Sequence, residues 1–363
     1  MVEYPADWKV ITLGSCFDMC AAGDLLKEYF SASYDSEHKW CIYSNAITNA
    51  GRYGYTSRPR YKGNALTITG RGTLGHAEYR DEDFDAIIRL IVLTPRNGVD
   101  CRFVTYWINF CNPFVRESTS IPQLTVPQVM NIQISLPTLP EQKRIAAVLT
   151  NADKLIANVE KRIAKKRAIK QGAMQELLTG KKRLPGFSGE WERKQFGDVL
   201  SYEQPHKYIV QNDEYVTTGI PVLTAGKSFV LGYTQEQSGI YNTLPVILFD
   251  DFLTVSRYVM VPFKVKSSAV KMLKAKDSND SLYFIYASMQ VLGFTPSDHQ
   301  RHWIGIYSKF PIMMPEAEEQ QAIAKVLSGM DAEIANLERK LKKLKLMKQG
   351  MMQDLLTGKV RLK

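Results

Sequence analysis

Cysteine is scarce in this 363-residue chain, and the few thiols argue against two classes of protein. All five cysteines fall at or before Cys111, and their odd number, in a chain whose first residues carry no export signal, argues against a disulfide framework. A zinc set could be drawn from Cys16, Cys20, His38 and Cys41. The first pair has three intervening residues, however, and no second pair matches it, so we expect reduced thiols and no metal.

Long apolar runs are missing as well. The longest, around residues 86–94, is interrupted by Arg89 and is too short to span a bilayer. With 45% hydrophobic and 23% charged residues, the composition is that of an ordinary folded protein of two or three domains. We therefore expect a cytoplasmic protein that does not associate with membranes.

One segment of the chain occurs twice. Residues 141–184 align with residues 319–362 without a gap, each position matching one 178 further on (319 − 141 = 178), and about half of the positions are identical. This period is far longer than the roughly 20 to 50 residues of solenoid and propeller repeats. The chain is therefore a tandem of two units, in each of which a non-repeated stretch long enough to bury a core precedes a repeated segment.

Proline is absent from both repeated segments, which allows each to form one long helix. Apolar residues recur at alternating steps of three and four from Ile145 to Ile163 and from Ile323 to Leu355, which indicates a single apolar stripe. Pro137 and Pro140 precede the first helix and Pro315 the second, and Thr179-Gly180 and Thr357-Gly358 end them.

A long helix with a narrow apolar stripe would expose that stripe if it stood alone. We therefore expect the two repeats to pack on each other as a coiled coil, although each could instead pack on its own globular domain. The stripe thins near Lys166 and Lys345, where the interface would be loose or would meet another protein.

The net charge of +10 is concentrated on the repeats. Residues 141–184 contain 12 Lys and Arg against 4 Asp and Glu, and residues 319–363 contain 10 against 5, which gives +8 and +5 and leaves −3 elsewhere. A charged helix face is often simply solvated. Together with the duplication, the positive charge favours a polyanionic partner.

The non-repeated stretches read as short strands and turns between Gly and Pro clusters, so the fold class is α+β, with mixed α/β domains. We expect strands at residues 65–69, 87–93, 245–249, 258–265 and 281–286.

Two motifs resemble parts of enzyme active sites, but neither is complete. Gly70–Gly75 matches the dinucleotide fingerprint, but the charged residues after it lack a helical stripe, and Asn112-Pro113-Phe114 lacks the second proline of the amino-methyltransferase motif.

Basic and aromatic side chains in both halves are candidates for nucleic-acid contact. Residues 51–62 interleave arginine with tyrosine, and the Gly70–Gly75 loop can bring its amides and Arg71 close to a phosphate or a base. His299 and His302 could also serve a metal or acid–base site. The stretch 51–62 and its counterpart from Lys264 to Lys271 could each be only a polar edge. The candidate residues are Arg52, Tyr53, Arg58, Arg60, Lys62, Arg71, His76, Lys227, Arg257, Lys266, Ser267, Lys271, His299 and Arg301.

The arrangement resembles the specificity subunit of type I restriction-modification systems. The resemblance is carried by Ile121–Pro127, Leu136–Ile145, Leu177–Gly180, Pro315, Glu319-Gln320, Ile323 and Leu355–Gly358. It covers the whole chain and implies target-recognition domains at residues 1–138 and 185–316. The repeated helices at residues 139–184 and 317–363 would then pack as an antiparallel coiled coil between them.

The resemblance implies a non-catalytic DNA reader. Each recognition domain would read one half of a bipartite, asymmetric site in double-stranded DNA, and the helices would set the gap between the halves. Two adenine-methyltransferase subunits and the restriction (translocase) subunits would be partners, and S-adenosylmethionine, ATP and Mg²⁺ would belong to those partners, with no cofactor on this chain. Two alternatives stay open: a specificity subunit of a combined methylation and cleavage system of another restriction class, and a coiled-coil scaffold that binds only proteins.

Overall fold

The computed structural model of the chain describes residues 4–96, 98–114, 123–226, 228–294, 296 and 300–363. It divides into two compact units, the first formed by residues 1–160 and 340–363 and the second by residues 161–339. Two long helices, α4 (Leu139–Leu177) and α7 (Ala317–Leu356), each contribute one part to each unit.

The predicted long helices are confirmed, and their ends lie where the sequence placed them. Helix α4 begins two residues after Pro137, and α7 begins two residues after Pro315. Both end just before a glycine in the left-handed region, Gly180 with φ 70° and Gly358 with φ 73°. Glycine adopts this conformation without the steric cost that a Cβ imposes, and it therefore terminates a helix readily.

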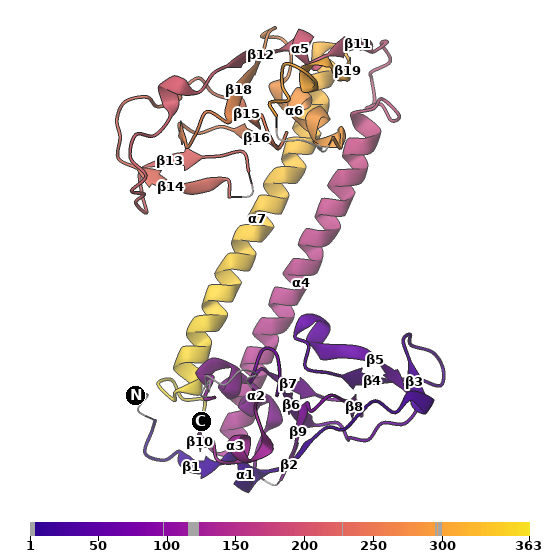
Figure 1. Cartoon of the computed structure of the whole chain (residues 1–363), viewed down its shortest axis with the longest axis vertical. Coiled ribbons are helices and arrows are strands. Elements are labelled where there is room, and N and C mark those ends of the chain that lie inside the picture. Colours follow the sequence, from indigo (N-terminus) through magenta and orange to yellow (C-terminus); the bar gives the residue numbers. More distant parts are fainter. Residues whose placement is uncertain (1–3, 97, 115–122, 227, 295, 297–299) are drawn as a thin grey trace. The chain divides into compact units, whose positions relative to one another are not determined.

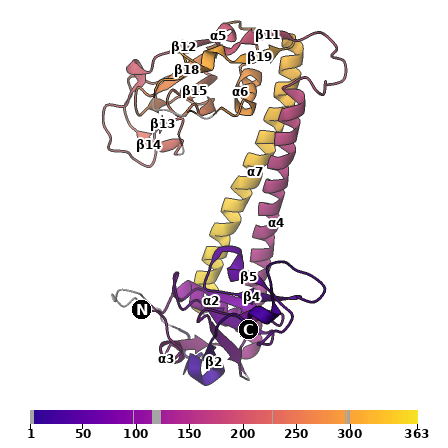
Figure 2. The same ribbon diagram turned by 45° about the vertical axis from the view of Figure 1, so that its right-hand side comes forward.

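The predicted packing of the two repeats on each other is confirmed. In each unit α4 and α7 run side by side and antiparallel (Figures 1 and 2). Lys348 pairs with Asp153 at 2.6 Å in the first unit, and the residues 178 positions away, Lys170 and Asp331, pair in the second. The region around Lys166, which we expected to be loose or to meet another protein, carries ion pairs between the helices. They are Lys166–Glu333 (2.5 Å), Arg167–Glu338 (2.5 Å) and Lys345–Glu160 (2.7 Å).

The ends of the two helices also belong to the globular cores. The repeats therefore pack both on each other and on the globular domains. Leu355 and Leu356, at the end of α7, are buried in the core of the first unit together with Ile145 at the start of α4. Leu177 and Leu178 take the same place in the core of the second unit, beside Ile323. The end of each repeat therefore completes the core that the start of the other repeat helps to form.

The first unit contains two four-stranded sheets and one isolated strand pair. The strands are short because turns and glycines interrupt the chain every few residues. The first sheet is ordered β2 (Phe17–Ala21), β9 (Ile91–Pro95), β6 (Ala65–Ile68), β7 (Ala77–Arg80); the second is ordered β3 (Phe30–Ser31), β5 (Arg52–Thr56), β4 (Trp40–Tyr43), β8 (Asp85–Ala86). The pair is β1 (Lys9–Thr12) with β10 (Gln133–Leu136), and the helices are α1 (Leu13–Cys16), α2 (Cys101–Cys111) and α3 (Val126–Met130).

The second unit repeats this topology with a different sequence, except that its second sheet has three strands and lacks a counterpart of β3. Its four-stranded sheet is ordered β12 (Leu200–Glu203), β18 (Val270–Ala275), β15 (Val246–Asp250), β16 (Ser256–Val259), and its three-stranded sheet β14 (Val230–Thr234), β13 (Ile220–Leu223), β17 (Lys264–Val265). β11 (Glu192–Gln195) pairs with β19 (Pro311–Met314), and α5 (Phe196–Val199) and α6 (Leu282–Val291) correspond to α1 and α2. Both units are thus mixed α/β, as predicted.

Three strand predictions need correction. Residues 281–286 form the start of α6, because Ser281 caps the helix by accepting a hydrogen bond from the Phe284 amide (3.3 Å) and the apolar face packs in the core. The run 258–265 is two separate short strands, β16 and β17. In the run 87–93 a tight turn delays the start of β9 to Ile91. The strands expected at 65–69 and 245–249 are present, with bounds shifted by a residue.

The five cysteines are free thiols in this structure. Within the described ranges, no cluster of His, Cys, Asp and Glu side chains could hold a metal ion. In the same part of the chain, no helix combines the length and apolarity that crossing a bilayer requires.

Candidate nucleic-acid interface

Three connections of the first unit lie at one edge of its two sheets. Strands β4 and β8 are parallel and end together, since Tyr43 is opposite Ala86. Strand β6 ends where β9 begins, since Ile68 is opposite Ile91. The loop 44–51, the loop 69–76 and the turn 87–90 are therefore neighbours, and we call them the first loop edge.

Asn45 joins all three parts of the first loop edge. Its side-chain oxygen accepts hydrogen bonds from the amides of Gly70 (2.8 Å) and Arg71 (3.3 Å), and its side-chain nitrogen donates to the carbonyl of Ile88 (2.5 Å). Segments far apart in the sequence are thus held by one amide group. Asn45 could not be predicted from the sequence, because no local pattern marks an asparagine whose partners lie 25 to 43 residues away.

The second unit has the corresponding edge. Leu223 is opposite Val265 in the parallel strands β13 and β17, and Asp250 is opposite Val270 in β15 and β18. Loops 224–226 with 228–229, 251–255 and 266–269 therefore gather at one edge, which we call the second loop edge. Each loop edge exposes a different set of side chains on the same topology.

Part of the predicted basic set lies on the first loop edge. Arg71 is exposed on loop 69–76 and donates to the side-chain oxygen of Gln123 at 3.4 Å. Arg52 is exposed at the start of β5, near Tyr43 at the end of β4, and Tyr53 follows it. His76, at the far end of loop 69–76, pairs with Glu78 at 3.0 Å.

The rest of the predicted set in the first unit is engaged within the protein. Arg60 pairs with Asp85 at 2.5 Å, and Lys62 pairs with Asp83 at 2.8 Å. Arg58 lies over the Tyr29 ring, 5.4 Å from its centroid. Arg58, Arg60 and Lys62 are therefore each held by a partner within the protein.

In the second unit the structure brings three of the predicted residues to the second loop edge. Lys266 and Ser267 lie on loop 266–269, and Lys266 pairs with Asp213. Arg301 lies over the ring of Phe252 on loop 251–255, 5.8 Å from its centroid. Arg257 lies on β16, over Phe229 at 5.8 Å. Lys227 and His299 lie outside the described residues.

Lys271 is not available to DNA in this conformation, which corrects the sequence-based prediction. Its side chain is 2% exposed and pairs at 2.8 Å with the Asp251 carboxylate, which is 1% exposed. Asp251 also accepts a hydrogen bond from the Trp303 amide (2.9 Å). The Lys271 ammonium therefore holds Asp251, and with it loop 251–255, in place and does not contact a phosphate.

The glycine-rich loop of the first unit is followed by a strand. Gly72 (φ 69°) and Gly75 (φ 78°) take left-handed conformations, and β7 begins at Ala77. The dinucleotide fingerprint requires a helix at this point, so the match to it is accidental.

Buried ion pairs fix the helix ends in both units. Arg361 donates to both oxygens of the Glu141 carboxylate (2.8 Å each), and Arg183 donates to both oxygens of Glu319 (2.6 Å each). The two pairs are equivalent, because Arg183 and Arg361, like Glu141 and Glu319, are 178 positions apart. Arg361 lowers the pKa of Glu141 through these hydrogen bonds. We did not predict these pairs, although the recurrence of Glu141 and Arg183 in the repeat was a visible signal.

We expect the first unit to lose stability in acid partly through Glu141. The pKa of Glu141 is lowered in the folded state, so its contribution is present above the unfolded value near 4.5 and is lost as the pH falls through the folded one. Glu141→Gln should therefore show a shallower decrease in unfolding free energy between about pH 5 and pH 3. Urea unfolding at a series of pH values measures this, and an equally steep decrease would contradict it.

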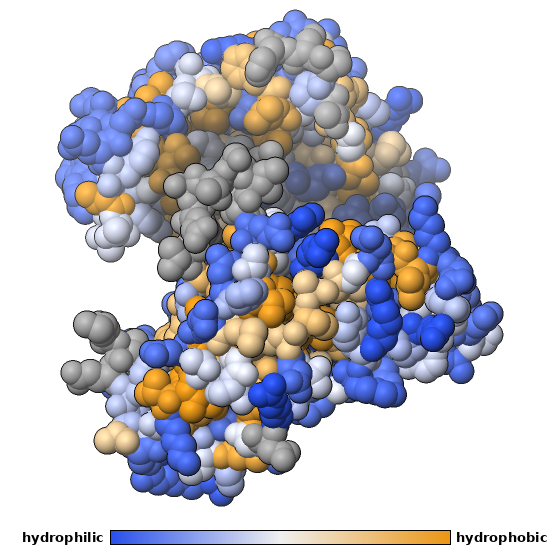
Figure 3. Space-filling view, turned by 60° about the horizontal axis from the view of Figure 1, so that its bottom comes forward, coloured by the Kyte–Doolittle hydropathy of each residue, from blue (hydrophilic) through white to orange (hydrophobic). Residues whose placement is uncertain are grey.

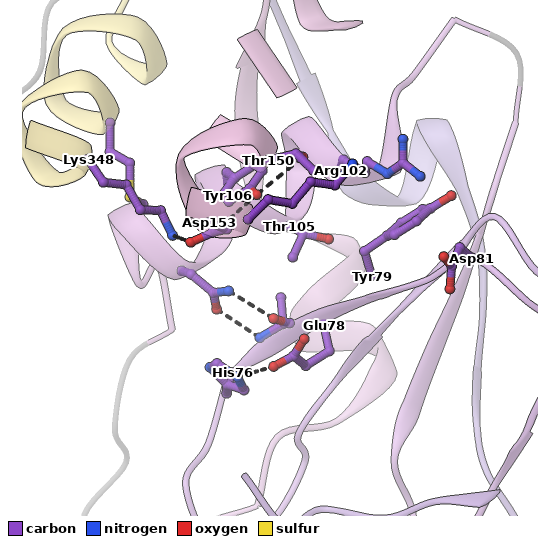
Figure 4. A pocket seen from close by; sticks show the side chains of 14 residues that line it. His76, Glu78, Tyr79, Asp81, Arg102, Thr105, Tyr106, Thr150, Asp153 and Lys348 are labelled. Atoms are coloured by element: carbon purple, nitrogen blue, oxygen red, sulfur yellow. Dashed lines mark hydrogen bonds and ion pairs between the residues drawn. The ribbon is translucent and has the colours of Figure 1, made fainter. Parts of the chain in front are cut away.

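A polar cluster links α2 to both long helices in the first unit (Figure 4). The Tyr106 hydroxyl donates to Asp153 at 2.7 Å, Lys348 donates to the same carboxylate at 2.6 Å, and burial raises the pKa of Tyr106. A cavity of about 520 Å³ opens beside the cluster, next to Arg102 stacked on Tyr79. In the second unit, the rings of Tyr258, Tyr283 and Tyr286 pack together at the corresponding place.

Comparisons with known proteins agree with one another. A family model described as "Type I restriction modification DNA specificity domain" matches residues 5–166 and again 188–346. The specificity subunit of the type I restriction enzymes EcoR124I and EcoR124II of Escherichia coli is 42% identical over 181 residues, covering 46% of this chain and 44% of that protein. The type I restriction enzyme MjaVIII specificity subunit of Methanocaldococcus jannaschii is 25% identical over 318 residues, covering 76% of this chain and 74% of that protein.

A solved structure shares the fold. The crystal structure of the type I restriction-modification system S subunit from M. genitalium matches with a TM-score of 0.75 at 16% identity, covering 98% of this chain and 97% of that one.

Proposed function

Since this chain belongs to the family of type I restriction-modification DNA specificity domains, we propose that it is the DNA-reading subunit of a methyltransferase and endonuclease complex and is not itself catalytic. The observation that carries the proposal is the repetition of one topology with two different loop edges. Two unlike readers suit a bipartite, asymmetric DNA sequence.

Each loop edge is the proposed reader of one half-site. Residues 1–138 and 185–316 would be the recognition domains, as the sequence predicts. Arg52 and Arg71 on the first loop edge, and Lys266 and Arg301 on the second, are the proposed contacts to phosphates or bases. Contacts to phosphates would supply sequence-independent affinity, and contacts to base edges in the grooves would supply specificity.

The paired helices are proposed to set the gap between the half-sites. Ion pairs at equivalent positions of both units support a helix pair of defined register, which a spacer requires. The helix length would then fix the number of unread base pairs.

The same helices are proposed to hold two adenine-methyltransferase subunits. Apolar side chains are exposed at equivalent positions, Val148 (37%) and Met347 (52%) in the first unit and Val326 (37%) and Ile169 (47%) in the second. Figure 3 shows that, on the face it draws, exposed apolar residues form small groups among hydrophilic ones. S-adenosylmethionine would bind to these partners, and ATP and Mg²⁺ to the restriction subunits, which drive translocation.

Charge at the two exposed apolar positions of one unit should remove one methyltransferase copy. In Val148→Asp/Met347→Asp an ionised carboxylate would have to be desolvated in the interface, so we expect the complex to lose one of its two copies. Native mass spectrometry measures the stoichiometry. Val326→Asp/Ile169→Asp should remove the other copy, and Asn151→Asp, an exposed polar position of α4, should remove none. Two copies retained in both double variants would contradict these docking positions.

The function itself is tested by co-expressing the chain with the methyltransferase gene adjacent to its own, in an unmethylated host, and mapping modified adenines. We expect a split motif with a constant gap that is absent without this chain. No new modification from a complex that does form would favour the protein-only scaffold. A separate translocase gene beside the methyltransferase gene would indicate a type I system rather than a combined methylation and cleavage system of another restriction class.

A further inference from the structure

The turn between β8 and β9 has a backbone conformation that its residues disfavour. Ile88 (φ 56°) and Arg89 (φ 61°) are both left-handed, and the Leu90 amide donates to the Ile87 carbonyl at 3.2 Å. This is the geometry of a type I′ turn, for which Asn-Gly is the favoured pair. A β-branched residue with positive φ is a true outlier, and such strain is often kept at functional sites.

The surrounding backbone holds the turn in place. The Ile88 amide donates to the Gly23 carbonyl (3.0 Å), and the Arg89 amide donates to the Ala22 carbonyl (3.1 Å). The Asn45 side chain donates to the Ile88 carbonyl, as described above. Because the backbone groups are directed to the protein, the side chains are left on the surface.

The strain brings no evident gain to the folded state. The Ile88 side chain is 46% exposed, so it buries little apolar area. Arg89 is exposed as well, and no residue in the described part of the chain forms an ion pair with it. A turn selected for stability alone would carry Asn-Gly here, so the side chains of Ile88 and Arg89 are retained for another reason than folding.

We propose that Ile88 and Arg89 are specificity-determining residues of the first loop edge that enter a groove of the DNA, and that Asn45 is their positioning residue. This inference rests on the proposed function. A guanidinium can bind the guanine O6 and N7 atoms as a pair or a backbone phosphate, and an aliphatic side chain can contact the thymine methyl group. Asn45 also binds the Arg71 amide, which places a second cation beside the turn.

In the second loop edge, the connection that corresponds to this turn lacks the device, and a positive φ occurs instead at Thr254 (φ 56°) on loop 251–255. The connection from β17 to β18 contains Lys266–Ala269, and among the described residues there none has positive φ. The two half-sites should therefore depend on the turn to different degrees.

The test is a double substitution that improves the turn and removes its side chains. Ile88→Asn/Arg89→Gly should fold with equal or higher thermal stability, since Asn-Gly suits the geometry. It should still relax base discrimination at one half-site of the methylated motif, with binding weakened roughly 10- to 100-fold, and leave the other half-site unchanged. The measurements are thermal unfolding, DNA binding and the map of modified adenines.

Three further variants separate the possible causes. Arg89→Ala leaves the backbone untouched and should relax the same half-site. Asn45→Asp keeps an acceptor for the loop 69–76 amides but loses the donor to Ile88, and should relax that half-site as well. Arg96→Ala, at the opposite end of β9, removes an exposed pair with Asp18 (2.7 Å) and should change neither half.

A stable Ile88→Asn/Arg89→Gly variant that reads both half-sites as the unsubstituted chain does would overturn the inference while leaving the proposed function intact. Equal relaxation of both half-sites would also overturn it, because the turn would then act on the whole complex. No methylated motif from the unsubstituted chain would overturn the proposed function and the inference together.

Discussion

Replacing Lys271 by alanine is expected to lower the unfolding free energy of the second unit by about 3–5 kcal/mol, because the Asp251 carboxylate would remain buried without its partner. The effect should be on folding and not on DNA affinity. Urea unfolding measures the first, and the salt dependence of DNA binding by the folded fraction measures the second. We expect an unchanged salt slope.

Lys266 is the matched control for this prediction. It lies five positions earlier, on loop 266–269, and its partner Asp213 is exposed. Lys266→Ala should change stability little, weaken binding to all sequences and reduce the salt slope by about one. A double Lys271→Met/Asp251→Leu variant should recover much of the lost stability, since the buried carboxylate is removed too. A reduced slope for a stable Lys271→Ala variant would return Lys271 to the DNA contacts.

Shortening both long helices by the same amount is expected to shorten the gap in the methylated motif. Deleting Asn158–Ala164 from α4 and Leu337–Lys343 from α7, which lie between the pairs Asp153–Lys348 and Lys170–Asp331, removes about two turns, or about 10 Å at 1.5 Å per residue. At about 3.4 Å per base pair this corresponds to a gap about three base pairs shorter. Both half-sites should stay the same, because the loop edges are untouched.

Mapping of modified adenines measures the gap directly. Deleting Asn158–Ala164 alone is the control, since it puts the remaining ion pairs, such as Lys348–Asp153, out of register with those beyond the deletion and should abolish modification. If the doubly shortened chain stays active with the original gap, the helices do not set the spacing.

The sequence predicted the large features of the fold because they depend on local patterns. Helix ends followed from proline and glycine positions, and the pairing of the repeats followed from an apolar stripe that water would otherwise contact. The resemblance to type I specificity subunits is confirmed by the family match over most of the chain. Helix α6 was missed because its aromatic residues favour strands, and a cap at Ser281 together with core packing outweighs that preference.

The candidate site was harder to predict, because its geometry arises from contacts between distant segments. Lys266 and Lys271 are close in sequence and carry the same charge, yet one lies on an exposed loop and the other is buried against Asp251. Only the strand register distinguishes them. Asn45 has no local signature at all, since its importance depends on three partners in other loops.

The sharing of helix ends between the two units has a consequence for synthesis of the protein. The second unit is one continuous stretch, residues 161–339, and all of its core residues are available once that stretch has left the ribosome. The core of the first unit needs Leu355 and Leu356, which are made after the whole of the second unit. Although domains generally fold from the N-terminus onwards, here the unit that begins the chain is the later one to be completed.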